Sequence, residues 1–179
     1  MTDRKIKVYL IPKDDQYSIG KLRSLIWKSK LGKPYFRQRE NGFLSISHSG
    51  DYFAFAVADC EIGIDLQKHD EKQRDYEKII SLFFHDHERA YIFGGKEGEF
   101  LTRFFHVWTA KESYVKFTGT GMDDHFAQFS VLDLENECHF YYVEDVGAQY
   151  TLCVCSKEEK EIKLEIESKE FKNGKIVKR

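Results

Sequence analysis

The sequence of 179 residues has few of the residues that separate or tether domains. It contains only 2 prolines, and no run rich in glycine and serine marks a flexible linker. No apolar stretch reaches the length of a signal sequence or of a membrane span. We therefore expect one folded unit, or two small halves that share an interface, in the cytoplasm and without a membrane partner.

Cysteine is also scarce. The four cysteines are Cys60, Cys138, Cys153 and Cys155, and no two of them have the CxxC spacing of a zinc site. Cys153 and Cys155 lie two positions apart in an apolar run, which places both on one face of a predicted strand. Buried free thiols in a reducing compartment are the expected result.

Neither sign of charge dominates, because the formal net charge is −2. This balance argues against a general binder of polyanions, and no nucleic-acid partner is expected. A local basic patch is nevertheless present, made up of Lys28, Lys30, Lys33, Arg37 and Arg39. Such a patch is either a solvated face or a surface for an anionic ligand or an acidic partner protein.

Aromatic residues, by contrast, are abundant at 15% of the chain, and many of them surround one long predicted helix. No proline or glycine interrupts residues 100–117, and Gly119 and Gly121 follow as a natural stop. Trp108, Glu112 and Lys116 recur every four residues, so they share one helix face. On its own this stripe is more typical of an amphipathic helix with one exposed Glu–Lys pair.

The remaining pattern predicts an α+β fold. Helices are expected over residues 17–30 and 76–93, the latter in two pieces, and strands over 6–11, 43–47, 52–58, 62–66, 126–134, 138–143 and 150–155, with an edge strand at 162–166. The strands between residues 43 and 66 are expected to form an antiparallel meander on the first helix. Because a helix followed by three strands occurs twice, we predict two pseudo-symmetric halves, 1–61 and 62–179. Each would be a helix packed on an antiparallel sheet, with the active site in the cleft between them.

Five short motifs occur in order between Gly32 and Gly121. They are Gly32-Lys33-Pro34-Tyr35, Ile46-Ser47-His48-Ser49, Ile62-Gly63-Ile64-Asp65, Phe83-Phe84 with Glu88, and Trp108-x-x-Lys111-Glu112-Ser113-x-x-Lys116. Together they resemble the phosphopantetheinyl transferase superfamily, in its surfactin-synthetase-activating (Sfp-type) branch. The resemblance implies a monomer that transfers the 4′-phosphopantetheine arm of coenzyme A to a serine of an acyl, peptidyl or polyketide carrier protein. Adenosine 3′,5′-bisphosphate would be released, and the basic patch would be a candidate docking surface for an acidic carrier.

The resemblance also implies roles for individual residues. Asp65 and Glu112 match the ligands of a Mg²⁺ ion, a cation that suits carboxylates and diphosphate oxygens. Lys116 matches a lysine that contacts the phosphates and protonates the leaving group, and Glu88 matches either the base or a neighbour of the metal. The residues that match coenzyme A contacts are Lys33, Ser47, His48, Lys111 and Lys116.

The sequence departs from this branch at two places. Gln67 stands where the branch commonly has a glutamate, so it would reach the metal only through its amide oxygen or a water, and we expect weaker Mg²⁺ binding. Only about thirty residues precede Gly32, fewer than in full-sized members. The basic residues that hold the 3′-phosphate of coenzyme A therefore cannot be carried over, and the candidates are Lys21, Arg23, Lys28 and Lys30.

Three readings stay open from the sequence. The first is an active transferase, and the second is a degenerate relative that binds coenzyme A or a carrier protein without turnover. The third is an unrelated α+β interaction domain. A transition-metal site at His85 and His87 is not expected, because residues two apart do not share a helix face and no third ligand is evident nearby.

Overall fold

The structure, a computed structural model, describes residues 5–30, 32–38, 42–69, 75–121, 125–134, 136–144, 149–159, 161–166 and 175–178. In chain order the elements are β1 (Lys5–Pro12), α1 (Gln16–Leu25), β2 (Ile26–Lys28), β3 (Pro34–Phe36), β4 (Phe43–Ser49), β5 (Tyr52–Ala58), β6 (Ile62–Lys68), α2 (Tyr76–Phe83), α3 (Asp86–Phe93), α4 (Phe100–Thr118), the 3₁₀ helix η2 (Val131–Asp133), β7 (His139–Glu144), β8 (Tyr150–Ser156), β9 (Glu161–Ile166) and β10 (Lys175–Lys178). The fold is mixed α+β, as the sequence predicts.

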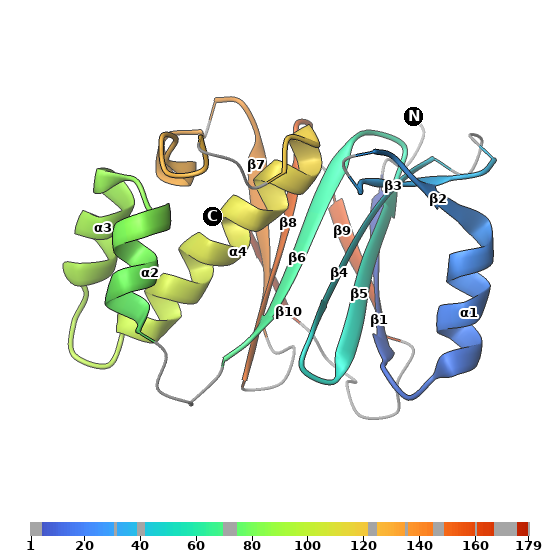
Figure 1. Cartoon of the computed structure of the whole chain (residues 1–179), viewed down its shortest axis with the longest axis horizontal. Coiled ribbons are helices and arrows are strands. Elements are labelled where there is room, and N and C mark those ends of the chain that lie inside the picture. Colours follow the sequence, from blue (N-terminus) through green and yellow to red (C-terminus); the bar gives the residue numbers. More distant parts are fainter. Residues whose placement is uncertain are drawn as a thin grey trace.

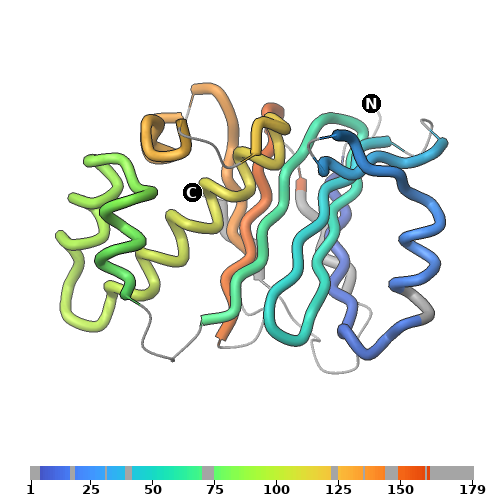
Figure 2. The backbone as a smooth tube through the Cα atoms, in the orientation of Figure 1, coloured from blue at the N-terminus to red at the C-terminus, as the bar shows by residue number. Residues whose placement is uncertain are grey.

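Two four-stranded sheets occupy the middle of the molecule (Figure 1). The first has the order β4-β5-β1-β9, in which β9 runs parallel to β1 and the other pairs are antiparallel. The second has the order β10-β7-β8-β6 and is antiparallel throughout. The chain trace shows α1 at one end of the molecule and α2 and α3 at the other (Figure 2). Because β9 lies within segment 62–179 and pairs with β1, both predicted segments contribute to the first sheet.

Alternation along the strands produces two apolar cores. Side chains of β1, β5, β6, β7 and β8 form the first core, in which Ile64, Leu66, Leu152 and Val154 are fully buried. The opposite face of β7 and β8 packs against α2, α3 and α4 in the second core, which includes Cys138, Cys153 and Cys155. Cys153 and Cys155 therefore share one strand face as predicted, and both are buried free thiols.

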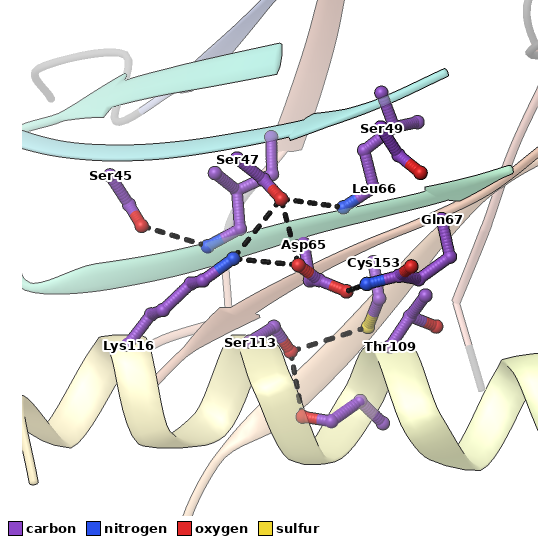
Figure 3. Close-up of polar contacts among 12 residues, drawn as sticks. Ser45, Ser47, Ser49, Asp65, Leu66, Gln67, Thr109, Ser113, Lys116 and Cys153 are labelled. Atoms are coloured by element: carbon purple, nitrogen blue, oxygen red, sulfur yellow. Dashed lines mark hydrogen bonds and ion pairs between the residues drawn. The ribbon is translucent and has the colours of Figure 1, made fainter. Parts of the chain in front are cut away.

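Side-chain hydroxyls, rather than a backbone ladder, link β4 to β6 across the junction of the two sheets. The hydroxyls of Ser45, Ser47 and Ser49 accept hydrogen bonds from the backbone N–H groups of Ile64, Leu66 and Lys68, at 3.0, 3.2 and 2.9 Å. Figure 3 shows the bonds of Ser45 and Ser47. We call these three serines the serine ladder. The predicted three-strand meander is wrong at its third strand, because β6 forms its backbone ladder with β8 in the other sheet.

Two other boundaries differ from the sequence prediction. The helix expected over residues 17–30 ends at Leu25, because Ile26–Lys28 pairs with Pro34–Phe36 as a short hairpin. The strand expected over residues 126–134 is absent from the described residues 125–134, which form turns and η2. An aromatic residue of this segment packs against the helices instead, since Phe126 lies edge-on to Phe83 of α2 and Trp108 of α4.

Gly63 allows α4 to lie directly on β6. A Cβ atom at this position would stand only 1.8 Å from the carbonyl oxygen of Ser113 and 2.6 Å from the amide nitrogen of Phe117. Both are backbone atoms of α4, so neither can move aside as the end of a flexible side chain would. The close approach brings the side chains of β6 and α4 that face each other into contact range.

We predict that Gly63→Ala lowers the free energy of unfolding by more than about 2 kcal/mol, because the added methyl group must push α4 away from β6. Urea unfolding measures the change. Gly20→Ala is the matched control, since nothing lies within 4 Å of its added Cβ in helix α1. That variant is expected to be neutral or slightly stabilising. Equal effects of the two substitutions would contradict the close-packing role of Gly63.

Candidate active site

A pocket of about 440 Å³ opens where the two sheets meet. β4 and the β2–β3 hairpin line one side of it, and β6, α2 and α4 line the other. The polar side chains of the lining are Lys28, Ser47, His48, Asp65, Gln67, Glu112 and Lys116. An aromatic wall completes it, formed by Tyr76, Phe104, Phe105 and Trp108. Residues from both sides of the predicted boundary at residues 61 and 62 thus meet in one cavity.

Asp65 is the most enclosed charged group of this pocket, with 1% of its surface exposed. Because side chains alternate along β6, Asp65 and Gln67 share the strand face of Gly63, which lies against α4. The Oδ1 atom of Asp65 accepts hydrogen bonds from Lys116 Nζ at 2.6 Å and from Ser47 Oγ at 2.8 Å (Figure 3). Its Oδ2 atom accepts from Gln67 Nε2 at 2.9 Å. These three hydrogen-bond donors compensate the carboxylate for the water that it loses on burial.

The hydroxyl group of Ser47 has no hydrogen-bonding capacity left. It donates to Asp65 Oδ1, and it accepts from the N–H of Leu66 and from Lys116 Nζ at 3.1 Å. A serine hydroxyl offers one donor and two acceptor positions, so all three are occupied. Ser47 was expected to contact coenzyme A. In the structure it lines the pocket and positions Asp65 and Lys116 relative to each other.

Glu112 lies one helical turn before Lys116 on the pocket side of α4. The pKa of Glu112 is raised to about 7, first by burial and then by the nearby charge of Asp65, while Lys116 opposes both effects. Two carboxylates, those of Asp65 and Glu112, thus lie near the ammonium group of Lys116. Together with the amide oxygen of Gln67, these carboxylates are the hard oxygen donors that a Mg²⁺ ion prefers.

Positive charge gathers around the open part of the pocket. His48 is exposed at the end of β4 and packs against the Phe53 ring. Its pKa is lowered, first by partial burial and then by the charges of Lys13, Lys116 and Lys28. Of the four basic residues that the sequence offers for a phosphate, Lys28 is the one that lines the pocket. This rim can attract an anionic ligand.

Lys33, which the resemblance implies as a coenzyme A contact, binds other groups of the protein in this structure. Its ammonium group donates to Glu61 Oε2 at 2.6 Å and to the carbonyl oxygen of Phe117 at 2.8 Å, near the end of α4. It lines a smaller neighbouring cavity of about 240 Å³, which shares Glu112 and Lys116 with the main pocket. The basic patch is thereby reduced on this face, and Arg39 lies outside the described residues.

Glu88 and Lys111 do not belong to the lining of the pocket, and both side chains are fully buried. Lys111 Nζ lies 3.0 Å from Glu88 Oε2 and also donates to the carbonyl oxygen of Phe129 at 2.7 Å. Glu88 accepts the N–H groups of His85 and Val131, each at 2.9 Å. Burial raises the pKa of Glu88 and lowers that of Lys111, while each partner's charge opposes the shift.

This buried pair joins α3, α4 and η2, a role that the sequence did not reveal. Glu88 closes a capping box with His85 at the start of α3. A histidine is an uncommon residue at that cap position, so the usual Ser/Thr-x-x-Glu signal was missing. Of the residues that the sequence predicts for the site, Asp65, Glu112 and Lys116 thus meet in the pocket, whereas Glu88 and Lys111 do not line it.

Comparison with known proteins agrees with the motifs. A family model described as the 4′-phosphopantetheinyl transferase superfamily matches residues 61–170. The chain belongs to this superfamily. The match contains Asp65, Glu112 and Lys116, whereas Ser47, His48 and Lys28 precede it.

Individual transferases of this superfamily are similar over part of their length. The 4′-phosphopantetheinyl transferase gsp of Aneurinibacillus migulanus is 33% identical over 98 residues, which are 55% of this chain and 39% of gsp. Psf-1 of Bacillus pumilus is 33% identical over 99 residues, 55% of this chain and 41% of psf-1. Sfp of Bacillus subtilis (strain 168) is 29% identical over 153 residues, 79% of this chain and 66% of Sfp. The chain thus spans well under half of the length of gsp and psf-1. Within the described residues, no helix is long and apolar enough to cross a membrane.

The raised pKa of Glu112 predicts that the stability of the metal-free protein depends on pH. Between pH 4.5 and about 7, the folded state retains a proton that the unfolded chain has released. The contribution of this group to the free energy of unfolding therefore falls as the pH rises, by about 3 kcal/mol at most. Urea unfolding at about pH 5 and about pH 7.5 measures the fall, which Glu112→Gln should remove.

Glu77→Gln is the control for this experiment, because Glu77 is an exposed carboxylate on α2. It should keep the pH dependence of the unchanged protein. If Glu112→Gln also keeps that dependence, Glu112 is not the group that couples stability to pH.

Proposed function

We propose that the protein transfers the 4′-phosphopantetheine arm of coenzyme A to a serine of an acyl, peptidyl or polyketide carrier protein. The serine oxygen forms a bond to phosphorus, the bond to adenosine 3′,5′-bisphosphate breaks, and the serine proton is released. The observation that carries this proposal is the convergence of Asp65, Glu112 and Lys116 in one pocket of a superfamily member. Phosphoryl transfer depends on positioning and on neutralising charge, and these residues can supply both.

Asp65 and Glu112 would hold a Mg²⁺ ion, with the amide oxygen of Gln67 as a weaker third donor. A bound Mg²⁺ neutralises negative charge on the diphosphate oxygens. It would also offset the two effects that raise the pKa of Glu112, its burial and the repulsion from Asp65. Gln67 fits the metal-free state as well, because its amide donates to Asp65 where a glutamate would add a further negative charge.

Lys116 would provide the second positive charge at the diphosphate. Its ammonium group already lies at the pocket, held by Asp65 and Ser47. Glu88 is too buried to take a proton from a carrier serine, so we assign it and Lys111 the task of fixing α4 beneath Glu112. Ser47 likewise positions the charged groups, and His48 and Lys28 remain as the side chains that face an incoming nucleotide.

We also propose that the two related halves of the chain have different roles. A sheet accompanied by α1 would receive coenzyme A, and a sheet covered by α4 would supply the metal ligands. All the described residues that line the pocket belong to one copy of the chain, and we propose that the protein acts as a monomer. Two other exposed side chains of the basic patch, Lys30 and Arg37, would meet an acidic carrier. A cytoplasmic location stays a prediction from the sequence.

Intact-protein mass spectrometry of apo carrier proteins, incubated with the protein, coenzyme A and Mg²⁺, tests the proposed transfer. We predict that the carrier gains one phosphopantetheine arm and that Glu112→Gln reduces the rate by at least about 100-fold, because a charge-stabilising group is lost. Glu77→Gln should leave the rate unchanged. Transfer at an equal rate by Glu112→Gln would contradict the assigned site. Stabilisation by coenzyme A without transfer to any carrier would favour a non-catalytic binder.

A second prediction concerns Lys28 as the partner of the 3′-phosphate. Lys28→Gln should raise KM for coenzyme A about tenfold and leave kcat nearly unchanged, since a ground-state contact is lost. The same variant should behave like the unchanged protein towards 3′-dephospho-coenzyme A, which lacks that phosphate. Lys21→Gln on α1 is the matched control, because Lys21 does not line the pocket. An equal penalty with both substrates would show that Lys28 acts elsewhere.

A further inference from the structure

Three potential metal donors meet on the surface beside α3, away from the lining of the main pocket. A ring nitrogen of His85, a ring nitrogen of His87 and a carboxylate oxygen of Asp133 all lie within 4.8 Å of one another. His87 Nδ1 is 2.8 Å from Asp133 Oδ2, and the two imidazole rings stand perpendicular with their centroids 4.9 Å apart. Asp133 comes from η2, far from the histidines in sequence.

The position of the helix start explains why histidines two residues apart converge. His85 is the cap residue of α3 and has extended backbone angles, φ −67° and ψ 156°, whereas His87 lies inside the first turn. Residues two positions apart do not share a face when both lie inside a helix, but here only His87 does. The third ligand that the sequence did not reveal is Asp133.

The buried carboxylate of Glu88 anchors the backbone of both segments that carry these donors. One carboxylate oxygen of Glu88 accepts the N–H of His85, and the other accepts the N–H of Val131, the first residue of η2. Lys111 pairs with this carboxylate in the protein interior. The two segments that bear the donors are thus held at a fixed separation before any ion arrives, which favours binding.

We propose that His85, His87 and Asp133 form a binding site for a divalent transition-metal ion such as Zn²⁺. Two imidazoles and one carboxylate are a donor set that suits Zn²⁺, with water in the fourth position. The donors of a tetrahedral Zn²⁺ lie about 3.4 Å apart, given bond lengths of about 2.1 Å. The exposed side chains of His87 and Asp133 can close to that spacing by small rotations, because 66% and 54% of their surfaces are free.

This site and the pocket differ in the cation they select. Oxygen donors in the pocket suit Mg²⁺, whereas imidazole nitrogen favours the later transition metals. An ion at His85, His87 and Asp133 would link α3 to η2 at the protein surface. Glu88 links the same two elements in the interior. Its role would be to stabilise the framework behind α4, and the inference does not depend on the proposed transferase activity.

Titration of the tag-free, metal-free full chain with Zn²⁺, using a chromophoric chelator as competitor, tests the site. The expected result is one Zn²⁺ per chain, a higher Tm, and the visible absorption of a tetrahedral complex when Co²⁺ replaces Zn²⁺. His87→Ala and Asp133→Asn should each weaken binding at least about tenfold, because each removes a ligand. Both positions are exposed, so the variants are expected to fold.

His139→Ala and Glu112→Gln serve as controls that should retain Zn²⁺ binding, since one histidine lies on β7 and the glutamate lies in the pocket. Zn²⁺ binding that survives both His87→Ala and Asp133→Asn would overturn the proposal. So would binding that disappears in Glu112→Gln, because the ion would then occupy the pocket. A chain that takes up no Zn²⁺ in competition with the chelator would equally refute it.

Discussion

The burial of one carboxylate, Asp65, governs how the two sheets and the long helix come together. A charged group that is 1% exposed must have partners, because its desolvation would otherwise cost several kcal/mol. Those partners come from three elements: Ser47 on β4, Gln67 on β6 itself, and Lys116 on α4. The close approach at Gly63 and the serine ladder both serve this geometry, since each brings one of the elements within reach of Asp65.

Much of this architecture follows from the pattern of the chain. Period-two alternation located β5 and β6 closely, and four-residue spacing placed Glu112 and Lys116 together on α4. The serine ladder could not be foreseen, because alternating serines are also typical of a solvated strand. The burial of Glu88 and Lys111 was equally hidden. Charged residues are assumed to be exposed until the partner that compensates them is known, and that partner lies 23 residues away in the sequence.

The pocket and the framework behind it use charge in opposite ways. In the framework, Glu88 and Lys111 neutralise each other within a dry, aromatic environment, where Phe129 also presents its ring face to the ammonium at 4.0 Å. In the pocket, the positive charge of Lys116 does not match the two carboxylates beside it, so the site is left receptive to a further cation. The buried pair of Glu88 and Lys111 therefore holds the framework in place, while Asp65 and Glu112 keep their capacity to bind a cation.

The parallel pairing of β1 with β9 has a consequence for how the chain is made. Lys5 pairs with Glu161, which follows it by 156 positions, so β1 lacks one of its two neighbours until β9 has been synthesised. Until then one edge of β1 stays open, and an open strand edge invites pairing with other chains. Such distant contacts also slow folding. The arrival of β9 therefore closes this edge of β1.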